Sequence, residues 1–421
     1  MQPPELVEVR RGPLLLAGVD DGAELRAHRE RVGPLPAVDL ARLVDVVGGA
    51  AVRGRGGAGF PLARKLATVA GIRGRRPSRR PVVVVNAAEG EPASAKDEAL
   101  VRVAPHLVLD GAEVTARALG VGEVHVVTSQ DRPAVGTAVD VAVAERAGRG
   151  LRWTHHRAEG RFVAGQASAV LQLMAGRPGL PVTSWAPAAR SGHRGRPTLL
   201  SNAESWAHLA AVVLHGPAAY AASGTPDEPG TSLLTLTEPP GPTGRVACAR
   251  VVEVGHGSRA ATVLGPGALV SPLLVGGFHG GWVHPREVPH LTVSAHHLRS
   301  LGLSFGAGTW ISLPEGSCPV TETARITSYL AAESAGRCGP CRHGLPALAD
   351  EVRGLAEGAD TRRRLRELAG LVTGRGACAH PDGTARLVAT LLDRLEDLVE
   401  DHLLGLCGGE PCRTAPLAVA R

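Results

Sequence analysis

The pattern of apolar and polar positions divides the chain into regions of different texture. Between about residues 36 and 228, apolar runs typical of buried strands alternate with segments of helical period. The run Pro81 to Val85 (PVVVV) predicts a strand that is buried on both faces, and Glu123 to Thr128 (EVHVVT) predicts a second. Helices are expected at 38–47, after Pro61 to about 70, and at 106–119, 133–147, 166–175 and 198–222. This alternation predicts an α/β domain with a parallel sheet.

The pattern changes twice more toward the C-terminus. From 231 to about 313, short apolar segments separated by Gly and Pro predict a small mixed β-domain. Beyond 321, apolar residues recur at helical spacing in four stretches, 326–334, 345–355, 361–372 and 385–403. The predicted organisation is an irregular N-terminal arm (1–35), an α/β domain (36–228), a β-domain (229–315), a helical domain (316–405) and a cysteine-containing tail (406–421).

Composition narrows the class of protein. The 421 residues are 44% hydrophobic and 20% charged, which suits a buried core and excludes a disordered or collagen-like chain. No apolar run reaches the roughly 18–20 residues of a membrane helix, and the N-terminus lacks the apolar stretch of a signal peptide, so we expect a cytoplasmic protein without membrane insertion. The net charge is +6, but aromatic residues are only 3% and no nucleic-acid module is recognisable, so nucleic acid is not an expected partner.

Four rare residues stand out against a strong compositional bias. Arginine supplies 44 of the 46 basic residues, which leaves Lys65 and Lys96, and the chain has only two asparagines, Asn86 and Asn202. Positions that keep Lys or Asn in such a chain are candidates for chemistry that needs a compact ammonium group or a carboxamide. Lys65, Asn86 and Lys96 lie in or beside the glycine-rich and acidic segments described next, and Asn202 lies in a later segment.

The segment GRGGAGFP, from Gly54 to Pro61, has four glycines in six positions ahead of a predicted helix. Glycine allows the backbone to approach a ligand closely, and amides at a helix N-terminus favour phosphate. The segment has neither the G-x-G-x-x-G spacing nor the Gly-Lys-Ser/Thr of a Walker loop, so a plain glycine-rich turn stays an alternative to a cofactor loop. Lys65, one helical turn further on, can supply positive charge for a phosphate.

The segment NAAEGEP, from Asn86 to Pro92, begins at the C-terminal end of the predicted buried strand, where open α/β sheets place ligands. Glu89 and Glu91 suit ribose hydroxyls, although an ordinary polar loop is an equal alternative. Lys96 and Asp97 are expected to form an ion pair at a helix start.

The seven cysteines are too few for a disulfide scaffold, and six of them follow residue 317. Cys338 and Cys341 form C-G-P-C, and Cys378 lies 37 residues later. The distant third cysteine favours thiolate coordination of an iron–sulfur cluster or of zinc over a thiol redox pair.

Taken together and in this order, the segments resemble the NADH-binding flavoprotein subunit (51 kDa, or F) of respiratory complex I and related diaphorase subunits. GRGGAGFP resembles the family's nucleotide loop, and NAAEGEP followed by Lys96-Asp97 is similar to its NADEGEPGxxKD segment. The stretch 195–204 (GRPTLLSNAE) is similar to GxPTxVNNVET, and 333–344 (ESAGRCGPCRHG) is similar to ESCGxCxPCREG.

The resemblance implies an FMN-binding Rossmann-like α/β domain, a small β-grasp (SLBB) domain and a four-helix iron–sulfur domain. It implies an NADH dehydrogenase-like enzyme that moves hydride from NADH or NADPH to FMN and passes electrons through a 4Fe-4S cluster to a partner. That partner would be a thioredoxin-like ferredoxin subunit, a ferredoxin, a flavocytochrome or a quinone-reducing complex, with a position at the periphery of a membrane complex as one option. The implied cofactor-binding residues are Gly54, Arg55, Gly56, Gly57, Ala58, Gly59, Phe60, Lys65, Asn86, Glu89, Glu91, Phe162, Gly165, Ser201 and Asn202, and the implied cluster ligands are Cys338, Cys341 and Cys378.

One departure from the family pattern affects the metal site. Ala335 stands where the family has its first cluster cysteine, so only three matched thiolates remain. The site could be empty, hold a three-iron cluster, or recruit another ligand from Cys318, His343, His380, Cys407 and Cys412. A helical domain that is stabilised by zinc and purely structural is a further alternative.

Other departures affect the nucleotide site. The family's G-E-E element reads Gly165-Gln166-Ala167, Phe162 replaces a tyrosine, and Ala88 replaces an aspartate. The loss of negative charge favours tolerance of a 2′-phosphate, as in NADPH, or loss of nicotinamide-nucleotide binding. A non-catalytic flavin-binding or scaffold paralogue is therefore the alternative function.

Overall fold

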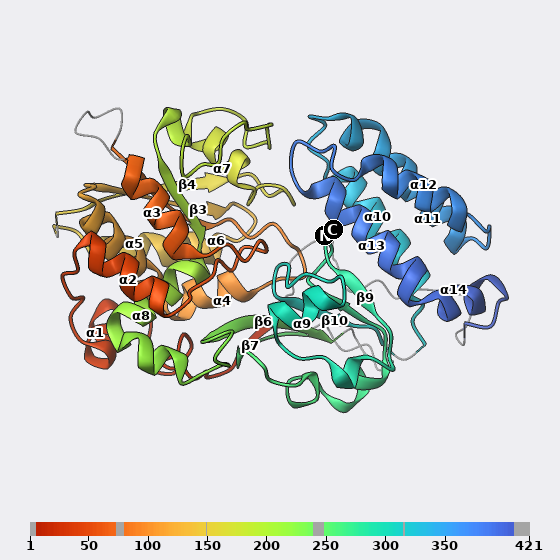
Figure 1. Ribbon diagram of the computed structural model, residues 1–421, viewed down its shortest axis with the longest axis horizontal. Helices are drawn as coiled ribbons and strands as arrows, with labels where there is room; N and C mark the ends of the chain where they lie inside the picture. Colours follow the sequence, from red (N-terminus) through yellow and green to blue (C-terminus); the bar gives the residue numbers. More distant parts are fainter. Residues whose placement is uncertain (1–5, 73–79, 149, 239–247, 315, 408–421) are drawn as a thin grey trace.

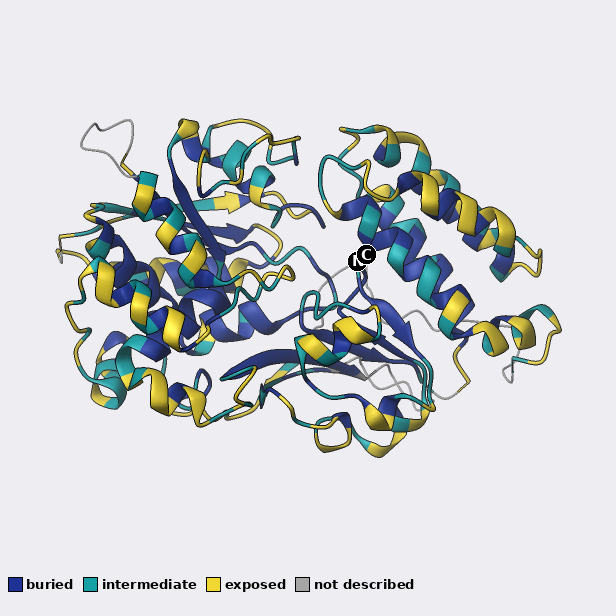
Figure 2. Cartoon of the chain, in the orientation of Figure 1, coloured by how far each residue is buried: buried dark blue, intermediate teal, exposed yellow. Residues whose placement is uncertain are grey.

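The computed structural model describes residues 6–72, 80–148, 150–238, 248–314 and 316–407. An α/β body, a mixed sheet and a helical region lie around a common centre (Figure 1). Buried residues gather inside the two sheets and on the sides of the helices that face them (Figure 2). None of the described helices has the length and apolarity needed to cross a bilayer.

A parallel four-stranded sheet forms the centre of the α/β body. Its order is β4-β3-β2-β5, with β2 at Val82–Ala87, β3 at Glu123–Ser129, β4 at Arg152–Ala158 and β5 at Thr198–Asn202. All six residues of β2 are buried, as the continuous valine run predicts. The surrounding helices are α2 (Leu40–Gly49), α3 (Leu62–Ile72), α4 (Lys96–Val103), α5 (Pro105–Leu119), α6 (Pro133–Ala144), α7 (Ala167–Met174) and α8 (Ala203–Ala221). The predicted α/β domain with a parallel sheet is confirmed.

Two elements of this body differ from the prediction. Residues 198–202 form strand β5 and not the start of a helix, because all five of them pair with residues 82–86 of β2. Helix α8 begins only at Ala203, where the side chain of Asn202 accepts a hydrogen bond from Ser205 N at 3.1 Å. Strand β4 (RWTHHRA) was not predicted, because at the edge of the sheet its side chains are mostly half-buried and show no apolar alternation.

The prediction of an irregular N-terminal arm was wrong. Strand β1 (Leu6–Val9) pairs in parallel with β7 (Cys248–Gly255), and α1 (Leu25–Val32) packs on α5. His28 Nε2 lies 2.8 Å from Asp110 Oδ2, and Arg29 Nη2 donates to Asp110 Oδ1 at 2.6 Å. The charge that made this segment look like a solvated arm partly neutralises a buried carboxylate, which sequence spacing does not reveal.

The mixed sheet has the order β1-β7-β6-β10-β8-β9. Its further strands are β6 (Thr231–Glu238), β8 (Leu273–Val275), β9 (Gly281–Val283) and β10 (Thr309–Ser312), and α9 (Ala295–Ser300) lies beside it (Figure 1). Short 3-10 turns occur at His193–Gly195, Ala260–Thr262, Pro266–Val270 and Val288–His290.

The C-terminal region is helical, as predicted, but its described part has five α-helices where four were expected. They are α10 (Pro319–Ala332), α11 (Leu345–Ala356), α12 (Arg362–Val372), α13 (His380–Arg394) and α14 (Glu396–Leu403). The predicted helix 385–403 is interrupted at Leu395, whose φ and ψ of −115° and 34° are not helical. A π-helical turn, Pro340–Gly344, precedes α11 and contains Cys341. Cys412 and most of the predicted tail lie outside the described residues.

Candidate functional site

The C-terminal ends of β2 and β5 bring the rare residues of the chain together. Asn86 and Asn202 are direct partners in the sheet register. The Asn202 amide nitrogen lies 3.4 Å from Asp97 Oδ2, and Lys96 Nζ donates to Asp97 Oδ1 at 2.8 Å. Lys65 reaches the same edge from α3, where its ammonium group donates to the carbonyl of Leu200 and lies 3.5 Å from Ser201 Oγ. The four residues that the composition singles out, Lys65, Asn86, Lys96 and Asn202, therefore lie at one edge of the sheet.

The predicted helix-start pair of Lys96 and Asp97 exists, but it is part of a buried network. Lys96 is only 3% exposed, and its ammonium group also contacts Glu204 Oε2 at 2.8 Å. The two carboxylates raise the pKa of Lys96 well above its usual range despite its burial. The network holds the start of α4 against the start of α8, directly behind the two asparagines.

Lys65 differs from Lys96 in its electrostatic surroundings. Within the described residues its contacts are neutral oxygens, and no carboxylate pairs with it. Burial of the uncompensated ammonium group lowers the pKa of Lys65 to about 8. A half-buried cation without a counter-charge, at the edge of a sheet where ligands bind, is suited to hold an anionic group such as a phosphate.

The glycine-rich loop lies between this edge and the mixed sheet. Gly56, Gly57 and Ala58 are exposed, and φ is +94° at Gly57 and +60° at Gly59, a conformation that favours glycine. A side chain at Gly56 would meet Asn202, and one at Gly57 would meet the backbone of Gly306. The loop thus offers one face to the α/β body and the other to the mixed-sheet region. The exposed backbone of this loop can therefore be approached closely by a ligand such as FMN.

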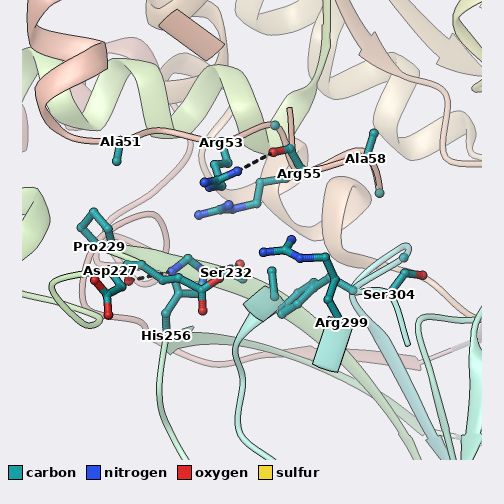
Figure 3. A pocket seen from close by; sticks show the side chains of 17 residues that line it. Ala51, Arg53, Arg55, Ala58, Asp227, Pro229, Ser232, His256, Arg299 and Ser304 are labelled. Carbon is teal, nitrogen blue, oxygen red and sulfur yellow. Dashed lines mark hydrogen bonds between the residues drawn. The ribbon is translucent and has the colours of Figure 1, made fainter. Parts of the chain in front are cut away.

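A pocket opens on the mixed-sheet face of the loop (Figure 3). Arg53 and Arg55 extend from the loop toward Ser232 and His256, and Arg299 reaches in from α9. Arg53 Nη1 donates to Gly59 O at 3.3 Å. Arg55 Nη2 donates to Thr231 O at 2.8 Å, and its buried Nε lies 3.8 Å from Glu204 Oε1. Three guanidinium groups at one opening suit phosphate oxygens. Sequence reasoning missed Arg53 and Arg299, because neither is distinguishable from 42 other arginines.

The carboxylates of Glu89 and Glu91 are already engaged by protein groups. Glu89 accepts from Ser94 Oγ at 2.5 Å and from Arg132 Nη1 at 3.1 Å, and it also accepts two backbone N–H groups at the start of α4. Glu91 accepts from Phe278 N at 2.8 Å, which ties the loop to the mixed-sheet region. Burial raises the pKa of Glu91 to about 7. These contacts hold the loop in shape, and the ribose contacts expected of both residues stay a prediction.

The segment around Phe162 connects the acidic loop with the helical region. Asn86 Nδ2 donates to Gly165 O at 2.8 Å, and a side chain at Gly90 would collide with the carbonyl of Phe162. The backbone N–H of Phe162 donates to Glu333 Oε2 at 2.9 Å, two residues before Ala335. The Phe162 ring also lies 5.4 Å from the ring of His380, centroid to centroid. The Phe162 segment therefore contacts both the acidic loop and the helical region that carries the cysteine segment.

The structure brings the three matched thiols together. Burial and the nearby thiols of Cys341 and Cys338 together raise the pKa of Cys378 to about 11. Burial, together with a hydrogen bond to Cys338, also raises the pKa of Cys341. The neighbouring thiols offer a soft donor set that fits a cluster with three protein ligands.

The candidates for a fourth ligand are mostly committed elsewhere. His380 is buried with both ring nitrogens engaged, Nδ1 at 2.9 Å from His279 Nε2 and Nε2 at 2.8 Å from Leu330 O. Cys318 and Cys407 both contact His402. His343 is exposed, and Cys412 lies outside the described residues. Within the described part of the chain, Cys338, Cys341 and Cys378 therefore stay the predicted cluster ligands.

Comparisons with known proteins agree with both halves of this site. Residues 47–211 match the family described as the Nuo51 FMN-binding domain, and residues 321–402 match the NADH-ubiquinone oxidoreductase-F iron–sulfur binding region. The chain is 26% identical to the F subunit of NADH-quinone oxidoreductase from Rhodobacter capsulatus, over 91% of this chain and 92% of that protein. It is 24% identical to the HndC subunit of the NADP-reducing hydrogenase from Solidesulfovibrio fructosivorans, over 91% of this chain and 80% of that protein.

A solved structure shows the same architecture. The crystal structure of an NAD+-reducing [NiFe]-hydrogenase in the air-oxidised state superposes with a TM-score of 0.79 at 25% identity, covering 94% of this chain and 68% of that one. Fold and site together define an oxidoreductase of the NADH dehydrogenase type, with an FMN-binding region and an iron–sulfur binding region. More particularly, the chain belongs to the family that comprises the F subunits of NADH-quinone oxidoreductases and the related hydrogenase diaphorase subunits.

Proposed function

We propose that this chain is the catalytic flavoprotein subunit of an NAD(P)H oxidoreductase, and that it keeps FMN chemistry with an altered iron–sulfur site. The observation that carries the proposal is the half-buried Lys65 ammonium group, which has no carboxylate partner within the described residues and lies beside Leu200 and Ser201 at the end of β5. Bound FMN supplies the conversion of a two-electron hydride into single electrons, which a cluster can carry away.

The residues around Lys65 have distinct tasks in holding FMN. Lys65 and the hydroxyl of Ser201 would hold the phosphate, and the exposed backbone of Gly56 and Gly57 would let the ring approach closely. Asn202 is fixed as the cap of α8, so the backbone at the end of β5 is rigid where the cofactor lies. Asn86, held to Gly165, closes the opposite side.

The arginine pocket binds the nicotinamide nucleotide. Arg53, Arg55 and Arg299 converge there from the loop and from α9 and provide charge for the pyrophosphate. The same charge accommodates a 2′-phosphate, so NADPH is an acceptable substrate beside NADH. The loss of carboxylates at Gln166 and Ala167 acts in the same direction.

The contact between Phe162 and the helical region would be the route from a bound flavin to the cluster. Glu333 anchors the Phe162 backbone, and the Phe162 ring lies near the rings of Tyr329 and His380. Cys338, Cys341 and Cys378 would hold the cluster, and the open fourth position of Ala335 suits a three-iron cluster. The mixed sheet corresponds to the SLBB-like domain, and the acceptor is a ferredoxin-like or flavocytochrome-like partner.

Anaerobic reconstitution tests this function. The purified chain is loaded with FMN and titrated with NADH and, separately, with NADPH, and flavin absorbance is followed. Bleaching by either nucleotide supports the proposal. Full FMN occupancy without bleaching by either would instead establish the second candidate, a non-catalytic flavin-binding or scaffold paralogue, which the missing carboxylates at Gln166 and Ala167 favour.

A further inference from the structure

Three potential metal ligands meet at the end of the helical region away from the thiols of the C-G-P-C segment. Cys318 Sγ lies 3.3 Å from His402 Nδ1, and Cys407 Sγ lies 3.5 Å from the same nitrogen. All three ligand atoms lie within 4.8 Å of one another. Cys318 directly precedes α10 and is only 4% exposed, while His402 and Cys407 come from the end of α14 and the residues just after it.

The orientation of the His402 ring is set by the contacts of its second nitrogen, Nε2. His402 Nε2 lies 3.2 Å from the carbonyl oxygens of both Leu355 and Ala356, at the C-terminal end of α11. The two carbonyl oxygens are acceptors, so Nε2 is the N–H that faces them and Nδ1 is the nitrogen that faces the two sulfurs. Metal-binding histidines are typically oriented in this way, with the second nitrogen donating to a backbone carbonyl.

The distances match a tetrahedral zinc site. Zinc–sulfur bonds of about 2.3 Å and a zinc–nitrogen bond of about 2.0–2.1 Å place sulfur and nitrogen about 3.6 Å apart in a tetrahedron, and two sulfurs about 3.8 Å apart. The observed separations of 3.3 Å and 3.5 Å, with the sulfurs within 4.8 Å of each other, need only small adjustment. We propose that Cys318, His402 and Cys407 bind a zinc ion.

This site is separate from the three thiols assigned to the cluster. Cys318 precedes α10, whereas Ala335 and Cys338 follow its other end. The 14 residues of α10 span about 20 Å at the usual rise. Cys318 and Cys407 are therefore ligands of a second centre, not replacements for the cysteine that is missing at position 335.

The ion would have a structural task. It would join the start of α10 to the end of α14, and through His402 to the end of α11. On binding, the two thiols lose their protons to solvent and the imidazole binds in its neutral form, so zinc with two thiolates is electrically neutral. These three side chains leave the fourth position of the tetrahedron to water or a further ligand.

Cobalt substitution of the unmodified full chain tests the proposal without any variant. We expect cobalt(II) added to zinc-depleted, reduced protein to give the intense visible bands of a tetrahedral ion together with sulfur charge-transfer absorption. Bound zinc should also protect Cys318 and Cys407 from alkylation, as read by peptide mass spectrometry. A weak octahedral cobalt spectrum, equal alkylation with and without zinc, or a Cys318–Cys407 disulfide in the reduced preparation would overturn the proposal.

Variants assign the ion to these residues. Cys318→Ser and His402→Ala should each remove one zinc equivalent per chain, measured by elemental analysis after equilibration with zinc and gel filtration. The matched control is Cys338→Ser, which removes a thiol of the cluster segment and should leave this zinc in place. Zinc that survives both Cys318→Ser and His402→Ala, or that is lost only with Cys338→Ser, contradicts the assignment.

Discussion

Replacement of Lys65 by methionine should weaken FMN binding specifically through the phosphate. The side chain keeps its length and apolar stem, but the ammonium group that contacts Leu200 O and Ser201 Oγ is gone. A hydrogen bond to a charged group contributes about 1.5–3 kcal/mol, which corresponds to a loss of about 10- to 150-fold in FMN affinity. Riboflavin, which lacks the phosphate, should bind the variant and the unmodified protein equally well.

The pH dependence of FMN affinity gives an independent check on the same residue. Because burial lowers the pKa of Lys65 to about 8 and the phosphate binds only the charged form, the affinity should be full below that pH. It should fall as the pH rises above it, by up to about tenfold per pH unit. Below about pH 6 the phosphate itself takes up a proton, so affinity should fall there as well.

Quenching of flavin fluorescence measures both affinities across this pH range. Arg42→Met, which removes an exposed positive charge from α2, is the matched control for a general loss of charge. An equal loss of FMN and riboflavin affinity in Lys65→Met would show that the variant disturbs the fold. Unchanged FMN affinity, or a pH profile that is flat around pH 8, would refute the assignment of Lys65 to the phosphate.

Three further predictions concern the loop, the cluster and the path between them. Burial raises the folded-state pKa of Glu91 to about 7, so the folded form binds the proton more tightly than the unfolded form, and the stability of the unmodified protein should fall between about pH 4.5 and 7. Glu91→Gln should abolish this fall, measured as the change of the urea midpoint with pH. A midpoint of the unmodified protein that rises over this range would contradict the prediction. Ala335→Cys should raise the bound iron from about three to about four per cluster, with a matching change in the electron paramagnetic resonance signal, and identical spectra would reject the three-iron assignment. Glu333→Ala removes the acceptor of the Phe162 N–H. The variant should lose about 1–3 kcal/mol of stability and transfer electrons from flavin to cluster more slowly. Equal stability and equal rates would show that this hydrogen bond contributes to neither.

The sequence predicts the parts of this molecule whose signals are local. Residues Val82 to Val85 of β2 are all valine because both faces of the strand are buried, so the sequence alone predicts a buried strand there. The helix cap of Asn202 follows from its residue type, but the strand before it does not. Residues 198–201 carry no strong strand signal, and they become β5 only by pairing with β2, more than 100 residues earlier.

The candidate site residues that the sequence names lie in contiguous motifs, and their roles toward FMN and a cluster stay predictions, whereas the residues that it misses have remote partners. The glycine loop, Lys65 and the three thiols follow from sequence segments, and the structure brings each group together. Arg299 enters the pocket from α9 with no motif around it, and His402 meets a cysteine 84 positions away. The carboxylates of Glu89 and Glu91 look like ligand groups in the sequence, but their partners, Arg132 and Phe278 N, come from distant segments.

Single-turnover rapid mixing of the FMN-loaded, cluster-containing chain tests the central claim most directly. Reduced nicotinamide nucleotide is mixed with the protein under anaerobic conditions, and flavin and iron–sulfur absorbance are followed on the same sample. The account predicts that the flavin band bleaches first and that cluster reduction follows at a rate independent of protein concentration, as expected for electron transfer within one chain. A flavin that stays oxidised with both NADH and NADPH, although FMN is fully bound, would contradict it.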